Sequence, residues 1–290
     1  MSRRGWLLFG AMCVIWGVPY LLIRVAVREV TPATLVFLRT GGSALLLLPL
    51  AAARGELRPA LARRRALLAF AAVEIAVPWL ALASAERRVS SSLAALLIGA
   101  VPFVSAVLAA SSGHERLGPR RVGGLAVGLA GVAAIVGFDL GRTSGIGLAE
   151  TAVVVAGYAT GPWLLARYLR DLPSLGVIAA SVALGAAVYA PVAALQLPDA
   201  VPSASALASI ATLTVLCTAV AFVLFFELIA EAGPVRATVI TYVNPAVAAL
   251  LGVAVLDEAF TPGMGAGFAL VLAGSVLATG AARQPAVAEP

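Results

Sequence analysis

PFVSAVLAASSGHERLGPRRVGGLAVGLAGVAAIVG, residues 102–137, decides the fold because its pattern of proline, glutamate and glycine occurs twice. The pattern is P-x12-E-x3-P-x4-G-x6-G-x5-G, and it returns 143 residues later in residues 245–280. The matched positions are Pro102, Glu115, Pro119, Gly124, Gly131 and Gly137, then Pro245, Glu258, Pro262, Gly267, Gly274 and Gly280. A period this long exceeds that of solenoid repeats and indicates one domain present in two copies.

The composition indicates a membrane protein. The chain has 290 residues, of which 61% are hydrophobic and 12% charged, whereas about 25% charged is usual for soluble domains. All 20 basic residues are arginines and give a net charge of +6. They lie between apolar runs, so they indicate membrane topology and no nucleic-acid partner is expected.

Ten apolar runs of about 20 residues are each long enough to cross a bilayer. They are residues 5–25, 32–53, 66–86, 90–111, 119–138, 145–166, 174–195, 204–230, 234–256 and 262–281. With the N-terminus in the cytoplasm, and with Arg24 and Arg39 set aside because they lie within spans, 14 arginines fall on the inner side and 4 on the outer side. The positive-inside rule therefore predicts that both termini are cytoplasmic.

The parity of the runs has a functional consequence. Each copy of the repeat contains five spans, so the second copy must enter the membrane with the opposite orientation. The sequence thus predicts an all-α integral membrane protein of ten transmembrane helices in two five-helix inverted-topology repeats. Such repeats are typical of secondary transporters that work by alternating access.

These features resemble the drug/metabolite transporter superfamily, and within it the EamA-type permeases. The resemblance rests on the duplicated acidic residue followed by P-x4-G-x6-G, on Trp16-Gly17 and on Arg39. It covers two EamA-like repeats, residues 6–138 and 146–281, and leaves 282–290 as a short cytoplasmic tail. It implies a multi-pass carrier of the bacterial inner (plasma) membrane, commonly an exporter of amino acids, related metabolites or toxic compounds.

Arg39 and Glu74 are the charges deepest within predicted spans. A charge at this depth costs ~2.5–3.5 kcal/mol and is expected to face the interior of the bundle. Arg39 could anchor a substrate carboxylate, or it could reach the headgroups or a structural partner. Glu74 could pair with Arg39, bind a cationic group or carry a coupling proton.

Several further side chains could line a substrate cavity, because they combine an apolar body with a polar group inside a span. For each of them, ordinary packing is the competing interpretation. Asn244 could also bond a backbone carbonyl freed by the proline that follows it. The candidates are Trp16, Tyr20, Trp79, Tyr158, Trp163, Tyr242 and Asn244.

Prolines within spans free a backbone carbonyl and introduce a bend. Four of them form repeat-related pairs, namely Pro19 with Pro162 and Pro102 with Pro245. They are candidate hinges for alternating access, and static shaping of the cavity is the alternative.

An exporter of small metabolites is therefore the predicted function, with efflux of cationic compounds as the alternative. An intramembrane enzyme is disfavoured, because the one histidine, His114, lies in a predicted loop and no catalytic motif is present. A channel would need pore-lining charge rings or a carbonyl filter motif, and neither is apparent in the sequence. The sequence predicts no cofactor and no metal site. The expected partners are the bilayer, a small-molecule substrate and a coupling proton as an open alternative, in a monomer or a homodimer.

Overall fold

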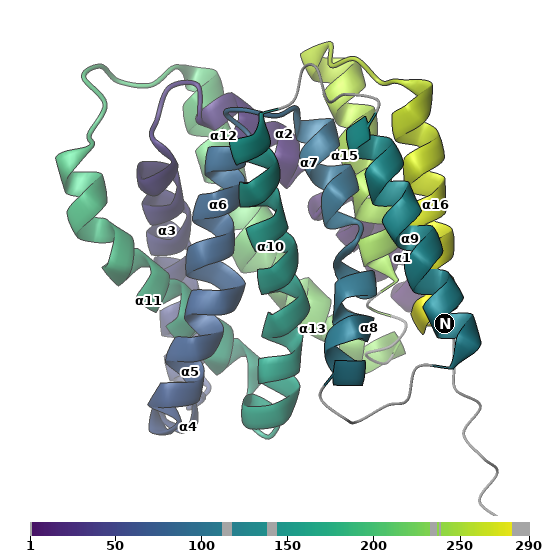
Figure 1. Ribbon diagram of the computed structural model, residues 1–290. Helices are drawn as coiled ribbons and strands as arrows, with labels where there is room; N and C mark the ends of the chain where they lie inside the picture. The colour runs from purple at the N-terminus through teal and green to yellow at the C-terminus, as the bar shows by residue number, and fades with distance from the viewer. Residues whose placement is uncertain (1, 112–117, 138–143, 233–236, 238, 280–290) are drawn as a thin grey trace, which may run out of the picture.

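The computed structural model describes residues 2–111, 118–137, 144–232, 237 and 239–279, and all regular structure within these residues is helical (Figure 1). The expected all-α fold is therefore confirmed. His114, Glu115 and the tail 282–290 lie outside the described residues.

The first half of the chain forms a succession of short and long helices. They are α1 (Arg3–Ile15), α2 (Pro19–Ala26), α3 (Pro32–Ala53), α4 (Leu57–Ala62), α5 (Arg64–Phe70), the π-helix η1 (Ala71–Ala76), α6 (Val77–Ala85), α7 (Ser91–Ile98), α8 (Val101–Ser111) and α9 (Pro119–Gly137). The upper end of Figure 1 holds the connection from α6 to α7, and the lower end holds α4.

The regular structure described in the second half of the chain is helical as well. Its elements are α10 (Gly145–Leu164), the π-helix η2 (Leu165–Leu169), α11 (Ser174–Leu195), α12 (Ala204–Thr214), the π-helix η3 (Val215–Val220), α13 (Ala221–Ala232), α15 (Ile240–Leu256) and α16 (Pro262–Thr279). Prolines start α3, α9 and α16, where the missing N–H would have no partner within the helix.

Within the residues that the structure describes, seven helical segments are long and apolar enough to cross a membrane. They are Arg3–Ala26, Pro32–Ala53, Arg64–Ala85, Ser91–Leu108, Gly145–Leu169, Ser174–Leu195 and Ala204–Ala232. Three further apolar helices are shorter, namely Val122–Val136, Ile240–Leu256 and Pro262–Leu277. The chain is thus built as a multi-pass membrane protein.

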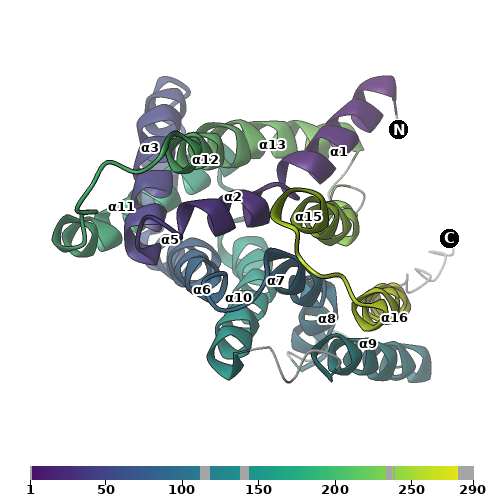
Figure 2. The same cartoon turned by 90° about the horizontal axis from the view of Figure 1, so that it is seen from above.

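The repeated glycines form the contact between α9 and α16. A Cβ on Gly131 would lie 2.6 Å from the Gly267 carbonyl oxygen, and one on Gly274 would lie 2.6 Å from the Gly124 carbonyl oxygen. Gly131 thus faces Gly267 while Gly124 faces Gly274, so the two helices run antiparallel. Figure 2 shows them side by side at one edge of the bundle, with α3 and α11 at the opposite edge. Small residues allow this approach of two backbones.

Two π-helices occupy corresponding places in the two halves. The helix η1 ends two residues before Pro78, whose ring would clash with the carbonyl of Glu74 in a regular α-turn. The wider π-turn relieves this clash, and the Val77 N–H bonds to the Ala72 carbonyl instead. The fourth residue of η1 is Glu74 and the fourth residue of η3 is Thr218. π-helical turns often occur at functional sites.

Candidate functional site

Arg39 is the centre of a buried polar cluster inside the helical bundle. Its guanidinium carbon lies 3.7 Å from the centre of the Trp79 ring, and its Nε donates a hydrogen bond of 2.9 Å to Thr218 Oγ1. Only 8% of Arg39 and 6% of Trp79 are exposed. A desolvated cation over an aromatic face gains about 2 kcal/mol, which offsets part of the cost of burying the charge.

Thr218 is oriented for this contact by the π-helix that contains it. Its hydroxyl donates 2.8 Å to the carbonyl of Leu213, five residues earlier, so the oxygen presents its lone pair to Arg39. Sequence reasoning did not identify Thr218. A threonine within an apolar run gives no signal of its own, and only its correspondence with Glu74 in the two π-helices distinguishes it.

Glu74 lies in η1 against the backbone of α10. Its Oε2 is buried and has no hydrogen-bond partner in the described part of the chain. A Cβ on Gly161 would overlap the Glu74 carboxylate, and one on Gly157 would lie 2.6 Å from the carbonyl oxygen of Val73. The two glycines, four residues apart on one face of α10, therefore let η1 and the start of α6 approach closely, and Gly161 makes room for Glu74.

Arg39 and Glu74 do not form the ion pair that the sequence left open. The three ion pairs found in the described part of the chain involve other residues. Tyr20 and Tyr158 interact electrostatically with Arg39, and Tyr158 interacts also with Glu74. The structure thus gathers five of the predicted site residues, Arg39, Glu74, Trp79, Tyr20 and Tyr158, around one region.

Two predicted tryptophans have different surroundings. Trp16 packs against Phe222 and Phe225, with ring centres 5.7 and 4.7 Å apart, in the cluster between α1 and α13. Trp163 is 37% exposed and makes an edge contact with Tyr168. Neither has a described contact with Arg39 or Glu74. Tyr242 lies partly buried on α15, two residues before Asn244.

Asn244 joins α15 to the break between α1 and α2. In the orientation that satisfies its amide, the NH2 group donates to the carbonyls of Ile240 at 3.0 Å and Cys13 at 3.1 Å. The Cys13 carbonyl is available because the N–H of Gly17 bonds to Val14 where the helix breaks. The expected alternative of a carbonyl freed by the following proline is therefore not the bond that forms. This arrangement favours a structural role.

The four proline candidates lie at different kinds of position. Pro19 begins α2 after a break, and Pro102 follows the break between α7 and α8. Pro162 lies inside α10 just before η2, and Pro245 lies inside the continuous helix α15. Their role as hinges remains a prediction.

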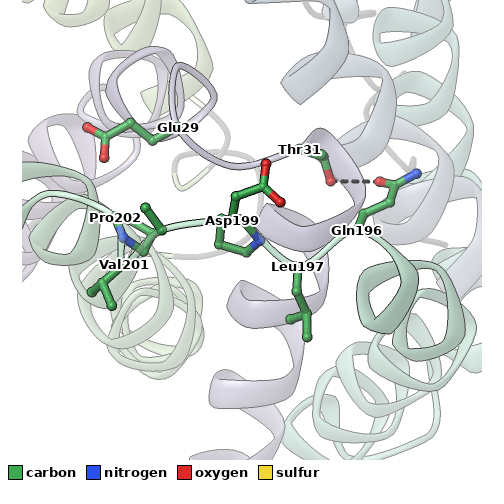
Figure 3. Close-up of a pocket in the computed structure, with 9 residues that line it drawn as sticks. Glu29, Thr31, Gln196, Leu197, Asp199, Val201 and Pro202 are labelled. Carbon is green, nitrogen blue, oxygen red and sulfur yellow. Dashed lines mark hydrogen bonds between the residues drawn. The ribbon is translucent and has the colours of Figure 1, made fainter.

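Two surface cavities lie at the upper end, away from the Arg39 cluster. The first has a volume of about 480 Å³ and is crossed by the loop 196–202, with Glu29 at one side and the Thr31–Gln196 hydrogen bond of 2.7 Å at the other (Figure 3). The second, of about 570 Å³, lies between α3, α6 and α11 and includes Arg87 and Glu150 in its lining. Neither of these two cavities is lined by Arg39, Glu74 or Trp79.

Polar contacts join the two halves of the chain at both ends of the bundle. At the upper end, Glu29 accepts hydrogen bonds from Ser203, which lower its pKa, and Arg88 pairs with Glu150 at 2.9 Å. At the lower end, Arg63 binds both carboxylate oxygens of Asp171, at 2.9 and 2.5 Å. Arg4 also pairs with Glu227 there, at 2.7 Å.

Comparison with known proteins agrees with the architecture. The model of the EamA-like transporter family matches residues 3–137 and again residues 143–280. A relative from Escherichia coli K12, named "Uncharacterized inner membrane transporter YedA", is 28% identical over 258 residues, which are 84% of this chain and 81% of the relative. The same protein from E. coli O157:H7 matches equally. A crystal structure aligned over 96% of this chain and 98% of its own has a TM-score of 0.66 at 21% identity, which shows a shared fold.

Proposed function

The chain belongs to the EamA-like transporter family, and we propose that it exports small metabolites, amino acids or related amphipathic compounds, across the bacterial inner membrane by alternating access. It is an inner-membrane, multi-pass transporter. The direction of transport and the class of cargo are the proposed parts. The substrate crosses without chemical conversion.

The observation that carries this proposal is a pair of buried ionisable side chains, Arg39 and Glu74, that form no ion pair with each other. The Arg39 Nε–H donates to Thr218 Oγ1 and its guanidinium lies over the Trp79 ring, while Glu74 Oε2 has no hydrogen-bond partner within the described ranges. Buried charges are costly unless paired. A zwitterion supplies both missing partners, because its carboxylate suits the planar guanidinium and its ammonium suits Glu74.

The aromatic residues favour a cargo with an apolar part. Trp79, Tyr20 and Tyr158 stand around the charged pair and present large apolar surfaces with a polar edge. Such surfaces bind flat or amphipathic molecules without requiring one particular shape. This supports a range of related substrates.

Alternating access requires two halves that can move relative to each other. We propose ten spans in two inverted five-helix repeats, residues 6–138 and 146–281, with both termini in the cytoplasm. The antiparallel contact of α9 with α16 supports this, because the contact pairs Gly131 with Gly267 and Gly124 with Gly274. Exchanging the repeats converts one pair into the other, as a twofold relation between the halves requires.

The test is substrate counterflow in proteoliposomes, together with growth protection of an export-deficient bacterial host against toxic amino-acid analogues. Arg39→Ala should remove both, while Arg58→Ala, at an exposed position, should leave them unchanged. Equal counterflow for Arg39→Ala and wild type, at matched protein levels, would contradict the proposed site. A flux that does not saturate would indicate a channel, and conversion of the cargo would indicate an enzyme.

A second candidate function is efflux of cationic compounds, and the unpaired Glu74 favours it. In that case Glu74→Gln would abolish protection against cationic dyes, whereas Arg39→Ala would retain it. Loss of protection against zwitterionic analogues in both variants would support the zwitterion instead.

A further inference from the structure

Glu86 is a buried carboxyl group that the proposed substrate site does not use. It follows α6 at the upper end of the bundle and is 0% exposed, and neither of its carboxylate oxygens has a hydrogen-bond partner among the residues that the structure describes. Arg24 lies nearby, but its guanidinium donates to the backbone carbonyls of Glu86 and Val89. The cation is therefore engaged by the backbone and forms no ion pair with the carboxylate.

Four titratable or charged groups surround Glu86. Arg24 and Tyr20 come from α2, Tyr158 comes from α10, and Glu258 follows α15. Tyr20 and Tyr158 also interact with Arg39, so they connect Glu86 electrostatically with the central cluster. Of these groups only Arg24 favours an ionised Glu86, and Glu258 opposes it.

Glu258 is already hydrogen-bonded to the N-terminus of α7. Its Oε1 accepts from the N–H of Ser91 at 2.7 Å, and its Oε2 accepts from the N–H and hydroxyl of Ser92 at 2.9 and 2.6 Å. The carboxylate therefore caps α7 as an anion, where the helix N-terminus favours negative charge. A second anion beside it is unfavourable, and burial together with this neighbour raises the pKa of Glu86 well above its usual range.

We propose that Glu86 is a proton-binding site, separate from the Arg39–Glu74 pair, and that its protonation holds the upper end of the transporter closed. The inference rests on the proposed alternating access and adds a coupling group to it. In the closed state the carboxyl group is neutral and buried among α2, α7 and α10. When the upper end opens, water reaches the group, which gives its proton to that water and becomes a carboxylate.

The direction of coupling follows from linkage. The proton binds the closed state more tightly than the open state, so a lower pH on the upper side favours closure. Between the two pKa values of Glu86, the ratio of closed to open protein changes by up to about tenfold per pH unit. In the proposed topology the upper end faces the periplasm, so an exporter that has released its cargo closes by taking up an external proton.

The experiment measures closure without any substrate. Spin labels are attached at Arg87 and Phe260, exposed positions in the first and second halves, after replacement of the buried Cys13 and Cys217 by alanine. Their distance distribution is recorded between about pH 5 and about pH 9 in nanodiscs. Wild type should shift from the open to the closed distance as the pH falls.

Glu86→Gln should remain closed across this range, because the amide is permanently neutral. Glu150→Gln is the matched control, since Glu150 is at the same end but pairs with Arg88, and it should keep the wild-type response. An unchanged pH response in Glu86→Gln would overturn the proposal. If that variant is not monodisperse, Glu86→Asp, which keeps a titratable group, should show a shifted midpoint, and an unshifted curve would overturn the proposal equally.

The two proposals fail in different ways. If the wild-type protein shows no counterflow but its label distance still responds to pH, the transport proposal alone is refuted. If counterflow is intact but Glu86→Gln shows the same pH response as wild type, the proton site alone is refuted.

Discussion

At the scale of single residues, Arg39 depends on the shape of its side chain as much as on its charge. Arg39→Lys keeps the charge but loses both the planar group over Trp79 and the Nε–H that Thr218 accepts. We expect the apparent substrate affinity in counterflow to fall at least about tenfold, equivalent to about 1.4 kcal/mol. Trp79→Phe, which keeps an aromatic face, should lose less. Equal affinity for Arg39→Lys and wild type would mean that charge alone suffices.

Gly161 tests whether the position of Glu74 matters. A side chain at Gly161 would overlap the Glu74 carboxylate, so Gly161→Ala must displace that group or open the contact between α10 and η1. We expect a loss of about 1–3 kcal/mol in stability and a loss of counterflow, measured by thermal melting and proteoliposome transport. Gly10→Ala is the control, because no atom lies within 4 Å of its added Cβ. Normal transport by Gly161→Ala would argue against a role of Glu74 in the site.

The local sequence around each residue explains which parts of the site could be predicted. Arg39 and Glu74 stand out because charges deep within apolar runs need a reason. Thr218 and Glu86 do not stand out, since a helix tolerates a threonine and Glu86 adjoins Arg87 at the end of a span. Their positions depend on π-turns and on contacts between distant helices. Whether the gathered residues bind substrate remains a prediction.

At the scale of elements, the contact between α9 and α16 depends on the absence of side chains. A Cβ on Gly131 would lie 2.6 Å from the Gly267 carbonyl oxygen and 2.6 Å from the Val271 nitrogen, and neither backbone can yield easily. Gly131→Ala should therefore destabilise the protein by about 1–3 kcal/mol, seen as a lower melting temperature in detergent. Gly123→Ala on the same helix meets nothing within 4 Å and should be neutral. Equal melting of both variants would contradict the contact.

Glu258 should make stability depend on acidic pH. Its partial burial disfavours the anion, but the hydrogen bonds from Ser92 and Ser91 outweigh this and lower its pKa. A lowered pKa means that the stabilisation is complete above the unfolded-state pKa and is lost as the pH falls through the folded-state pKa. We expect Glu258→Gln to cost about 1–2 kcal/mol at neutral pH and less in acid. Thermal melting at acidic and neutral pH measures this, and an equal deficit at both would argue against the charge.

The elements themselves were predictable to different degrees. Helix starts at Pro32, Pro119 and Pro262 follow from local chemistry, because proline fits the first turn of a helix. The π-helices have no comparable signature, apart from Pro78, which lies two residues after the end of η1. The bond from Asn244 to Cys13 requires α15 to pass the break after α1, and only the tertiary structure shows this.

At the scale of the whole molecule, the contacts between the halves set the balance between open and closed states. Arg63–Asp171 joins the connection between α4 and α5 to the one between η2 and α11 at the lower end. The side chains are 46% and 54% exposed, so the pair contributes only about 1 kcal/mol. That amount still changes a two-state population about fivefold. Weak pairs of this kind suit a transporter, because each end must open during every cycle.

Breaking this pair should favour opening of the lower end. Arg63→Ala should increase the fraction of molecules open at that end about fivefold, measured by the rate at which a cysteine placed at the buried Leu169 reacts with a water-soluble maleimide. The exchanged variant, Arg63→Asp with Asp171→Arg, should restore the wild-type rate, because the opposite charges face each other again. Arg58→Ala, at an exposed position of the same helix pair, should have no effect. If the exchanged variant reacts as fast as Arg63→Ala, the ion pair does not hold the lower end closed, and packing alone must do so.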